Sequence, residues 1–533
     1  MRISSWKIFA FITTLLVLIP LLVIFLSWLE PEWGIWSHLW ETVLGDLLTN
    51  TFFMVTGVAV GTLVLGVSLA WFTAVCDFPG RRFFSWALLL PLAMPTYVLA
   101  FVCLGIFDFS GPVQTELRSW FGTSSWFPEV RSTGGVILVM TLALYPYVYF
   151  LVRSAFLTQG KRMLEVGESL GCGHFRAFFK IVLPMARPWI AGGVMLVIME
   201  TLADFGAVSI FNFDTFTTAI YKAWFGFFSL PAASQLASCL VVLVFIILVI
   251  EQKMQSRMRF SERSISPKKE RVHLKASTGW VVCAYASSVL LVAFILPVLQ
   301  LLTWTMDVFH EEFSARYFSL LGHSLFLGIC AALIVGAIAL ILAYTLRHHE
   351  DSFTLAMVRI SNLGYALPGT VLAVGIFIPV AMVDNFIIYS AKSLFGINIG
   401  QIFQGTVFIM LVAYTVRFMA AGFKSIDSAM HRVTPSINEV SNLMGLSGLK
   451  LLRRVHIPML RTGMLTAMTL VFVDVMKEMP ITLMTRPYGW DTLAVKIFEL
   501  TSEGEWERAS LPALTLLIAG LVPIIILTRY TEK

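Results

Sequence analysis

Long uninterrupted apolar runs constrain this chain more than any other feature of its sequence. Twelve segments are each continuously apolar for about 20 residues, the length that crosses a hydrocarbon layer as a helix. A barrel strand would instead alternate apolar and polar residues. With 58% hydrophobic and 13% charged residues, the chain is predicted to be an all-α polytopic membrane protein. In hydrocarbon the backbone N–H and C=O groups find no water, so each span must satisfy its hydrogen bonds internally, as a helix does.

The twelve predicted transmembrane helices form two groups of six. The first group is a run that ends near Leu29, then residues 51–74, 83–107, 134–157, 190–211 and 233–251. The second group is residues 279–304, 321–346, 357–383, 403–423, 462–484 and 511–528. The predicted organisation is a first half at 1–251, a basic cytoplasmic linker at 252–278 and a second half at 279–533.

Basic residues set the predicted orientation. Most of the 38 Lys and Arg residues fall in loops on the side that also carries both chain ends, and they are densest at 252–278. Lys and Arg accumulate in cytoplasmic loops during membrane insertion, so both termini are predicted to be cytoplasmic. The net charge of +6 follows from this topology, and nucleic acid is not expected as a partner.

The two halves repeat one another. Residues 90–100 align with residues 363–373 at an offset of 273 (363 minus 90), and residues 47–71 align with 320–344 at the same offset. An even number of spans in each half gives both halves the same orientation. They are therefore predicted to be parallel six-helix repeats.

One short pattern recurs in the loop between the fourth and fifth spans of each half. Glu is followed after six positions by Gly and after thirteen more by Pro, at Glu165, Gly171 and Pro184 and again at Glu439, Gly445 and Pro458. Glycine permits a sharp backbone turn, and proline suits the first turn of a helix. Each stretch is predicted to be a cytoplasmic helix–turn–helix that enters a groove on a partner protein.

These residues resemble the cytoplasmic signature loop of bacterial ABC importer permeases, although Val166-Gly167 and Val440-Ser441 stand where that family has two alanines. The resemblance implies the binding-protein-dependent ABC permease fold and two copies of an ATPase subunit, one on each loop. The chain has no Gly-x-x-x-x-Gly-Lys-Ser/Thr phosphate loop. We therefore expect a transport subunit that is not itself an enzyme, binds no cofactor and relies on a separate subunit to hydrolyse ATP.

Further stretches resemble the fused ferric-iron permeases, namely residues 203–206, 216–226, 477–480 and 491–494. This resemblance implies a bacterial inner-membrane location, a periplasmic substrate-binding protein on the outer side and import of ferric iron by alternating access. Fused permeases for thiamine, polyamines and phosphonates share the architecture, so those substrates remain alternatives. A secondary transporter driven by an ion gradient is a more remote alternative, since residues 76–82 resemble part of a loop of that class.

Ionisable residues within the predicted spans are candidates for the translocation path: Glu200, Asp204, Asp474, Lys477 and Glu478. An offset of 274 (474 minus 200) places Glu200 on Asp474 and Asp204 on Glu478, and the i, i+4 spacing predicts one shared helical face for each pair. Charges in a bilayer usually face a cavity or a partner. Carboxylates suit Fe³⁺, which Asp204 and Glu478 would hold transiently.

Two questions stay open at this point. The intramembrane acids have a structural alternative, in which Lys477 pairs with one of them and Glu200 contacts backbone amides at a helix break. The aromatic residues of the outer loop at 108–133 are typical either of anchoring at the membrane interface or of a surface that docks a binding protein.

Overall fold

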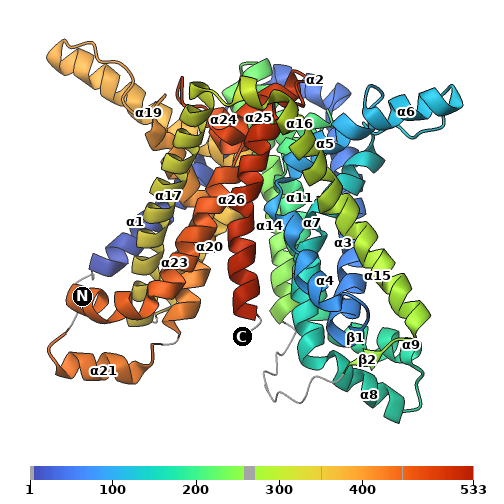
Figure 1. Cartoon of the computed structure of the whole chain (residues 1–533). Helices are drawn as coiled ribbons and strands as arrows, with labels where there is room; N and C mark the ends of the chain where they lie inside the picture. Colours follow the sequence, from blue (N-terminus) through green and yellow to red (C-terminus); the bar gives the residue numbers. More distant parts are fainter. Residues whose placement is uncertain (1–4, 257–270, 350, 432, 447, 532–533) are drawn as a thin grey trace. The chain divides into compact units, whose positions relative to one another are not determined.

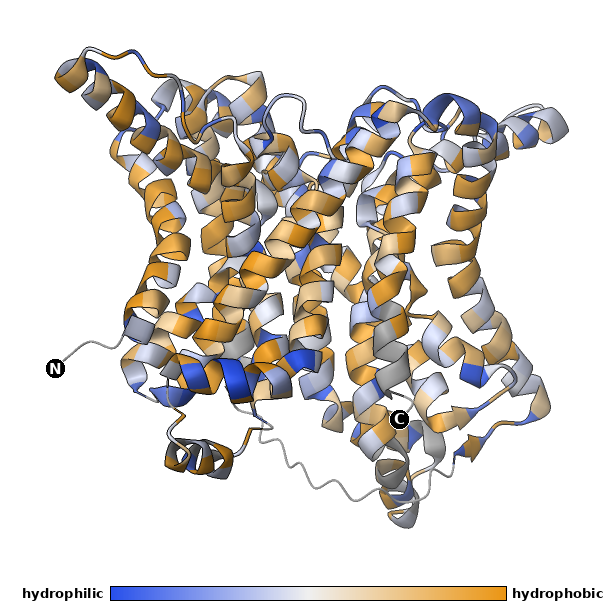
Figure 2. Cartoon of the chain, turned by 60° about the vertical axis from the view of Figure 1, so that its left-hand side comes forward, coloured by the Kyte–Doolittle hydropathy of each residue, from blue (hydrophilic) through white to orange (hydrophobic). Residues whose placement is uncertain are grey.

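The computed structural model describes residues 5–256, 271–349, 351–431, 433–446 and 448–531. Within these ranges the chain is almost entirely helical (Figure 1), and the prediction of an all-α polytopic membrane protein is confirmed. Two short strands pair in parallel, β1 (Cys76–Asp77) with β2 (Val272–His273). Hydrophobic residues cover the long helices and hydrophilic residues gather near their ends (Figure 2).

The number of spans roughly fits the twelve predicted. Among the described residues, ten helices are long and apolar enough to cross a membrane, or eleven if the bent pair Phe178–Met185 and Arg187–Ala203 is one span. The last predicted span, 511–528, lies in helix α26 (Ser510–Thr531).

The chain divides into two compact units that do not follow the halves of the sequence. Unit 1 comprises Met1–Ser37, Ala219–Val241 and Phe313–Lys496, and unit 2 comprises His38–Thr218, Val242–Glu312 and Ile497–Lys533. The division into halves at 1–251 and 279–533 stays a prediction about the repeat. Of the predicted linker, residues 257–270 lie outside the described residues.

In unit 1, helix α1 (Ser5–Leu26) packs on α18 (Ser352–Ser361) and α19 (Gly369–Phe395), both from the second half of the sequence. The Thr14 hydroxyl is hydrogen-bonded to the Ser361 hydroxyl at 3.2 Å. Next to these, α17 (Ala315–His348), α20 (Val407–Met430) and α23 (Ile457–Lys477) pack against one another.

In unit 2, helix α3 (Leu44–Val75) packs closely along α7 (Thr133–Ala155), and α11 (Arg187–Ala203) covers both. A Cβ added at Gly61 would lie 2.5 Å from the Thr141 hydroxyl, and one added at Gly66 would lie 2.7 Å from Val148 Cβ. Small residues therefore set the distance between these two helices, as is common where membrane helices pack. Helix α16 (Leu296–Glu312) comes from the second half of the sequence and packs on α26.

Prolines break two of the predicted spans, which are therefore wrong as continuous helices. The predicted span 83–107 consists of α4 (Arg81–Ala87), η2 (Leu90–Ala93) and α5 (Thr96–Phe107). The predicted span 357–383 breaks in the same way at η7 (Leu363–Ala366). Pro95 and Pro368 immediately precede the second helices, and proline disfavours helical backbone at the residue before it.

The remaining elements connect these helices or extend them. They are η1 (Ser27–Leu29), α2 (Trp33–Thr42), α6 (Pro112–Phe121), α13 (Phe216–Tyr221), η5 (Lys222–Gly226), α14 (Leu230–Ser256), α15 (Ala276–Leu290), η6 (Leu291–Ile295) and α25 (Leu493–Ser502).

Candidate coupling loops and intramembrane charges

The two Glu–Gly–Pro stretches adopt the same turn. In the first, α8 (Lys161–Ser169) is followed by Gly171 at φ +76°, and the Cys172 N–H donates to the Gly167 carbonyl at 2.9 Å. In the second, α21 (Pro435–Leu443) is followed by Gly445, also at φ +76°. There the Leu446 N–H donates to the Ser441 carbonyl at 3.0 Å, so both helices end in the glycine-dependent Schellman pattern.

The second part of each stretch also begins alike and then differs. After α9 (His174–Ala177) and α22 (Gly448–Leu451), each chain passes through a π-helical turn, η4 (Phe178–Val182) and η8 (Leu452–His456). Pro184 lies in the first turn of α10 (Leu183–Met185), and Pro458 lies in the first turn of α23. The first copy then bends by 65° before α11, whereas the second continues directly into α23.

Apolar side chains at matching positions are exposed on both loops, and sequence reasoning missed them. Val166 and Leu170 are 43% and 71% exposed, and Val440 and Met444 are 56% and 74% exposed. The members of each pair are four residues apart at the ends of α8 and α21, and the offset of 274 relates one pair to the other. Exposed apolar surface of this kind is typical of a protein interface. Glu165 and Glu439 are exposed beside these pairs.

An aromatic residue on a long helix contacts each loop. Trp71 of α3 lies 5.4 Å from the Phe156 ring and 4.6 Å from the Phe178 ring, measured between centroids. In unit 1, Tyr344 of α17 donates its hydroxyl to the Gly448 carbonyl at 3.2 Å. Trp71 and Tyr344 are equivalent at the repeat offset of 273 (344 minus 71). Each loop is therefore held to a spanning helix at the same place.

The predicted span 190–211 breaks at Asp204. Helix α11 ends at Ala203, Asp204 is extended at ψ 130°, and a new helix, α12 (Gly206–Ile210), begins. One carboxylate oxygen of Asp204 accepts the Ala207 N–H at 2.9 Å and the Val208 N–H at 3.3 Å. The other accepts the Thr96 hydroxyl at the start of α5. Asp204 therefore caps α12 and ties it to α5.

The predicted span 462–484 breaks in the equivalent place. Helix α23 ends at Lys477, and α24 (Pro480–Thr485) follows. The Glu478 carboxylate accepts the Ile481 N–H at 3.2 Å through one oxygen and pairs with Arg417 Nε at 3.1 Å through the other. Arg417 also donates to the Leu367 carbonyl at 2.7 Å. Sequence reasoning missed Arg417, although a cation inside the predicted span 403–423 is itself a signal.

Backbone amides at helix breaks hold Asp204 and Glu478 in place, whereas the structural alternative names Glu200 for such a contact. The single helical face predicted for each acid pair is wrong, because both helices end one residue before the second acid. Glu200 still lies within electrostatic range of Asp204, as Lys477 does of Asp474. A role of these residues in the translocation path stays a prediction.

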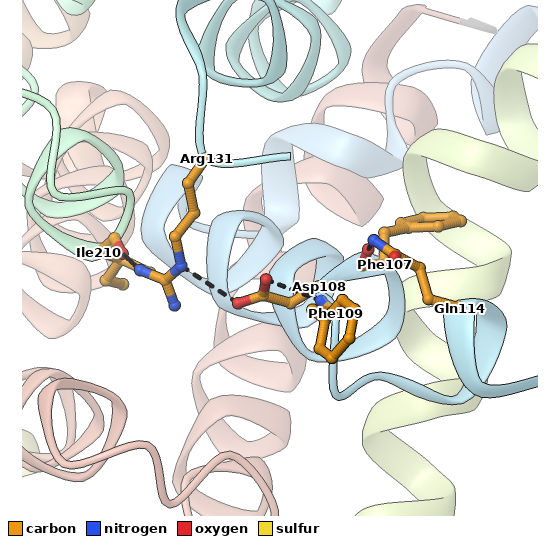
Figure 3. Close-up of polar contacts among 6 residues, drawn as sticks. All are labelled: Phe107, Asp108, Phe109, Gln114, Arg131 and Ile210. Atoms are coloured by element: carbon orange, nitrogen blue, oxygen red, sulfur yellow. Dashed lines mark hydrogen bonds and ion pairs between the residues drawn. The ribbon is translucent and has the colours of Figure 1, made fainter. Parts of the chain in front are cut away.

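Figure 3 shows how the loop at 108–133, which is predicted to lie on the outer side, is tied to this region of unit 2. Arg131 pairs with Asp108 at 3.1 Å and donates to the Ile210 carbonyl, the last residue of α12, at 3.2 Å. Gln114 of α6 donates to the Phe107 carbonyl at 2.9 Å. The exposed aromatic residues Trp120, Phe121 and Trp126 lie on this loop, so a partner that binds them acts on a segment linked to α12.

Asp204→Asn is expected to lower uptake by about tenfold, which corresponds to ~1.4 kcal/mol, while membrane insertion stays intact. Asparagine keeps an oxygen for the α12 amides and loses the charge. Uptake in vesicles and abundance in membranes measure the two effects. Glu116→Gln on exposed α6 removes a charge from the same unit as a control, and normal uptake in Asp204→Asn would exclude the path role.

Comparison with known proteins gives this geometry a context. Residues 62–260 match the family described as binding-protein-dependent transport system inner membrane component. The chain is 24% identical over 495 residues to the Fe(3+)-transport system permease protein FbpB 2 of Haemophilus influenzae, covering 92% of this chain and 91% of that protein. It is 27% identical over 206 residues to the molybdenum transport system permease protein ModB of Escherichia coli, covering 38% and 86%. It is 26% identical over 255 residues to the sulfate transport system permease protein CysT of Escherichia coli, covering 46% and 88%.

The relatives fall into two groups according to how much of this chain they match. ModB and CysT match less than half of this chain, whereas FbpB 2 matches it almost from end to end. Three observations point to a membrane permease: the chain is long enough for two permease halves, it has many apolar helices, and part of it matches the family. This family match implies an ATPase and a substrate-binding protein as partners in general. Residues 62–260 therefore match the inner-membrane component of binding-protein-dependent transport systems, and the chain as a whole, a multi-pass membrane protein, resembles the fused ferric-iron permeases.

Proposed function

We propose that this permease forms the translocation path for ferric iron and works by alternating access. The observation that carries the proposal is the near end-to-end similarity to a protein named for Fe(3+) transport. Relatives named for molybdenum and sulfate support oxyanion import as a second candidate. The acids at Glu200, Asp204 and Asp474 favour a cation, because carboxylates along a path would repel an oxyanion.

The proposed partners follow from the two loops. One copy of an ATPase subunit binds each Glu–Gly–Pro loop on the cytoplasmic side, where both chain termini also lie. A periplasmic binding protein delivers the substrate on the outer side. The permease itself binds no cofactor, and the ATPase subunits use the ATP. The equal turns at Gly171 and Gly445 and the exposed apolar pairs beside them support two equivalent docking sites.

In this proposal a single helix carries the motion of each loop to an acid-capped break. Helix α11 has 17 residues and joins the first loop to Asp204, a length of about 25 Å at 1.5 Å per residue. Helix α23 has 21 residues and joins the second loop to Glu478, a length of about 31 Å. A helix moves as a rigid element, so a displacement at the loop reaches the break that the carboxylate holds.

Uptake by membrane vesicles that contain the permease, its ATPase and its binding protein tests the proposal. Fe³⁺ supplied on the binding protein is expected to accumulate with ATP and not with a non-hydrolysable analogue. Molybdate and sulfate at equal concentration are expected to remain outside. Accumulation of an oxyanion instead would replace iron as the substrate. Uptake that survives ATP depletion and collapses with the ion gradient would contradict the ATP-driven mechanism.

A further inference from the structure

Helix α4 and strands β1 and β2 lie at the end of unit 2 that carries α8 and α9 of the first coupling loop (Figure 1), and three arginines belong to or adjoin these segments and the end of α7. Arg81 begins α4, Arg153 lies in the last turn of α7, and Arg271 directly precedes β2. The parallel pairing of Cys76 with Val272 brings Arg271 next to the end of α3. The chain thus brings together cations from three segments that are distant in the sequence.

Among the described residues, the charges that act on Arg81 are mostly positive. Arg271, Arg153 and exposed Arg82 all act electrostatically on Arg81, whose side chain is 11% exposed. The neighbouring carboxylate is that of Asp77, whose oxygens lie 3.5 Å from Arg81 Nε and 3.6 Å from His273 Nδ1. Burial and the charge of Arg271 together lower the pKa of the Arg81 guanidinium from its ordinary value, although Asp77 opposes the shift.

The Nε groups of these three arginines point to a missing partner. In the described part of the chain, Nε of Arg81, of Arg153 and of Arg271 is buried and has no hydrogen-bond acceptor, although Arg81 Nε forms the 3.5 Å ion pair with Asp77. The Tyr149 hydroxyl, which lies near Arg81 and Arg153, already donates to the Ser85 carbonyl at 3.0 Å. Buried donors are nearly always satisfied in folded proteins, so three unsatisfied ones in a cluster of like charges indicate a bound acceptor.

We propose that Arg81, Arg153 and Arg271 bind a phosphate-bearing anion between the ends of α3, α7 and β2. The planar guanidinium group stays charged and presents paired N–H donors that match phosphate oxygens. Basic pockets between membrane helices bind anionic headgroups at the cytoplasmic surface, and a free phosphate has the same oxygens. Arg153 lies three residues before Phe156, which contacts Trp71, so the anion holds these segments together beside the first coupling loop.

The test uses the full chain in nanodiscs, with two arms that separate the sources of phosphate. In one arm, inorganic phosphate is titrated into phosphatidylcholine nanodiscs at constant ionic strength, and thermal unfolding is followed. In the other, phosphate-free nanodiscs contain phosphatidylglycerol at increasing fractions, and native mass spectrometry counts the lipids that stay bound. The variants are Arg81→Gln, Arg153→Gln and Arg271→Gln. The matched control is Arg347→Gln, at the end of α17 in unit 1, where Arg347 contacts His431.

We expect stabilisation by phosphate, by phosphatidylglycerol or by both, and the arm that responds identifies the source. Each variant in the cluster is expected to need about fivefold more ligand for the same response, and the Arg347→Gln control is expected to respond as the native chain does. If Arg81→Gln does not fold, the comparison relies on Arg271→Gln, because Arg271 lies outside the helices and its substitution is expected to leave them folded. No response of the native chain in either arm, or equal responses of the cluster variants and the native chain, would overturn the proposal.

Discussion

Gly171→Val and Gly445→Val are expected to reduce ATP-driven uptake at least tenfold each, and together to abolish it. Both glycines are held at φ +76°, where a β-branched residue is a rare outlier. A left-handed backbone costs an L-residue roughly 1–2 kcal/mol, so the turn opens and the second part of the loop loses its direction. Uptake and permease-stimulated ATP hydrolysis in vesicles measure the loss.

Gly173→Val is the control for this prediction. Gly173 lies two residues after Gly171, its φ is outside the left-handed region, and an added Cβ would meet no atom within 4 Å. The variant therefore changes the same loop without backbone strain, and near-normal uptake is expected. All variants are expected to reach the membrane in normal amounts, since the turns lie outside the apolar helices. Normal uptake in the double glycine variant would contradict the role of the turns in coupling.

The turns were predictable from the sequence because their cause is local. A glycine six residues after a glutamate in a short polar stretch, repeated at one offset, already specifies where each helix ends. The breaks before Pro95 and Pro368 are local in the same sense, and the continuous spans predicted there overlooked the proline rule. The spans were predicted from the length of each apolar run, and the prolines within those runs were not taken into account.

The break at Asp204 was not predictable in this way. No proline follows Asp204 directly, and the partners that fix its carboxylate and its carbonyl are Thr96 and Thr217. Thr96 lies 108 residues earlier in the chain, so only the folded unit brings the two together. The packing of α1 with helices of the second half could not be predicted from the sequence for the same reason. Hydrophobicity indicates that a helix is buried, but it does not indicate which helix it packs against.

At the two acid-capped breaks, equivalent positions carry different side chains whose sizes compensate for one another. Thr96 is equivalent to Gly369 at the repeat offset of 273 (369 minus 96), and Asp204 is equivalent to Glu478 at 274. A Cβ at Gly369 would lie 2.7 Å from Glu478 Oε1, so the longer acid occupies the space that the threonine fills in unit 2. The hydroxyl donor of one half is replaced by the Arg417 guanidinium in the other.

Arg417→Met is expected to destabilise unit 1 by about 3–5 kcal/mol, the usual cost of removing one partner from a buried ion pair. The side chains of Arg417 and Glu478 are 13% and 6% exposed, so the carboxylate that remains is poorly solvated. The variant also deprives the Leu367 carbonyl of its donor, at the point where η7 leads into α19. Unfolding of the purified permease in detergent, by heat or denaturant, measures the loss.

The double variant Arg417→Met/Glu478→Gln separates the structural role of the pair from a role in transport. Glutamine keeps an oxygen for the Ile481 N–H and carries no charge, so most of the lost stability is expected to return. Equal instability of the single and double variants would contradict the ion-pair explanation. If Glu478 also lines the translocation path, the stable double variant will remain deficient in uptake. If both stability and uptake are restored, the role of Glu478 is structural, and it stabilises the break between α23 and α24.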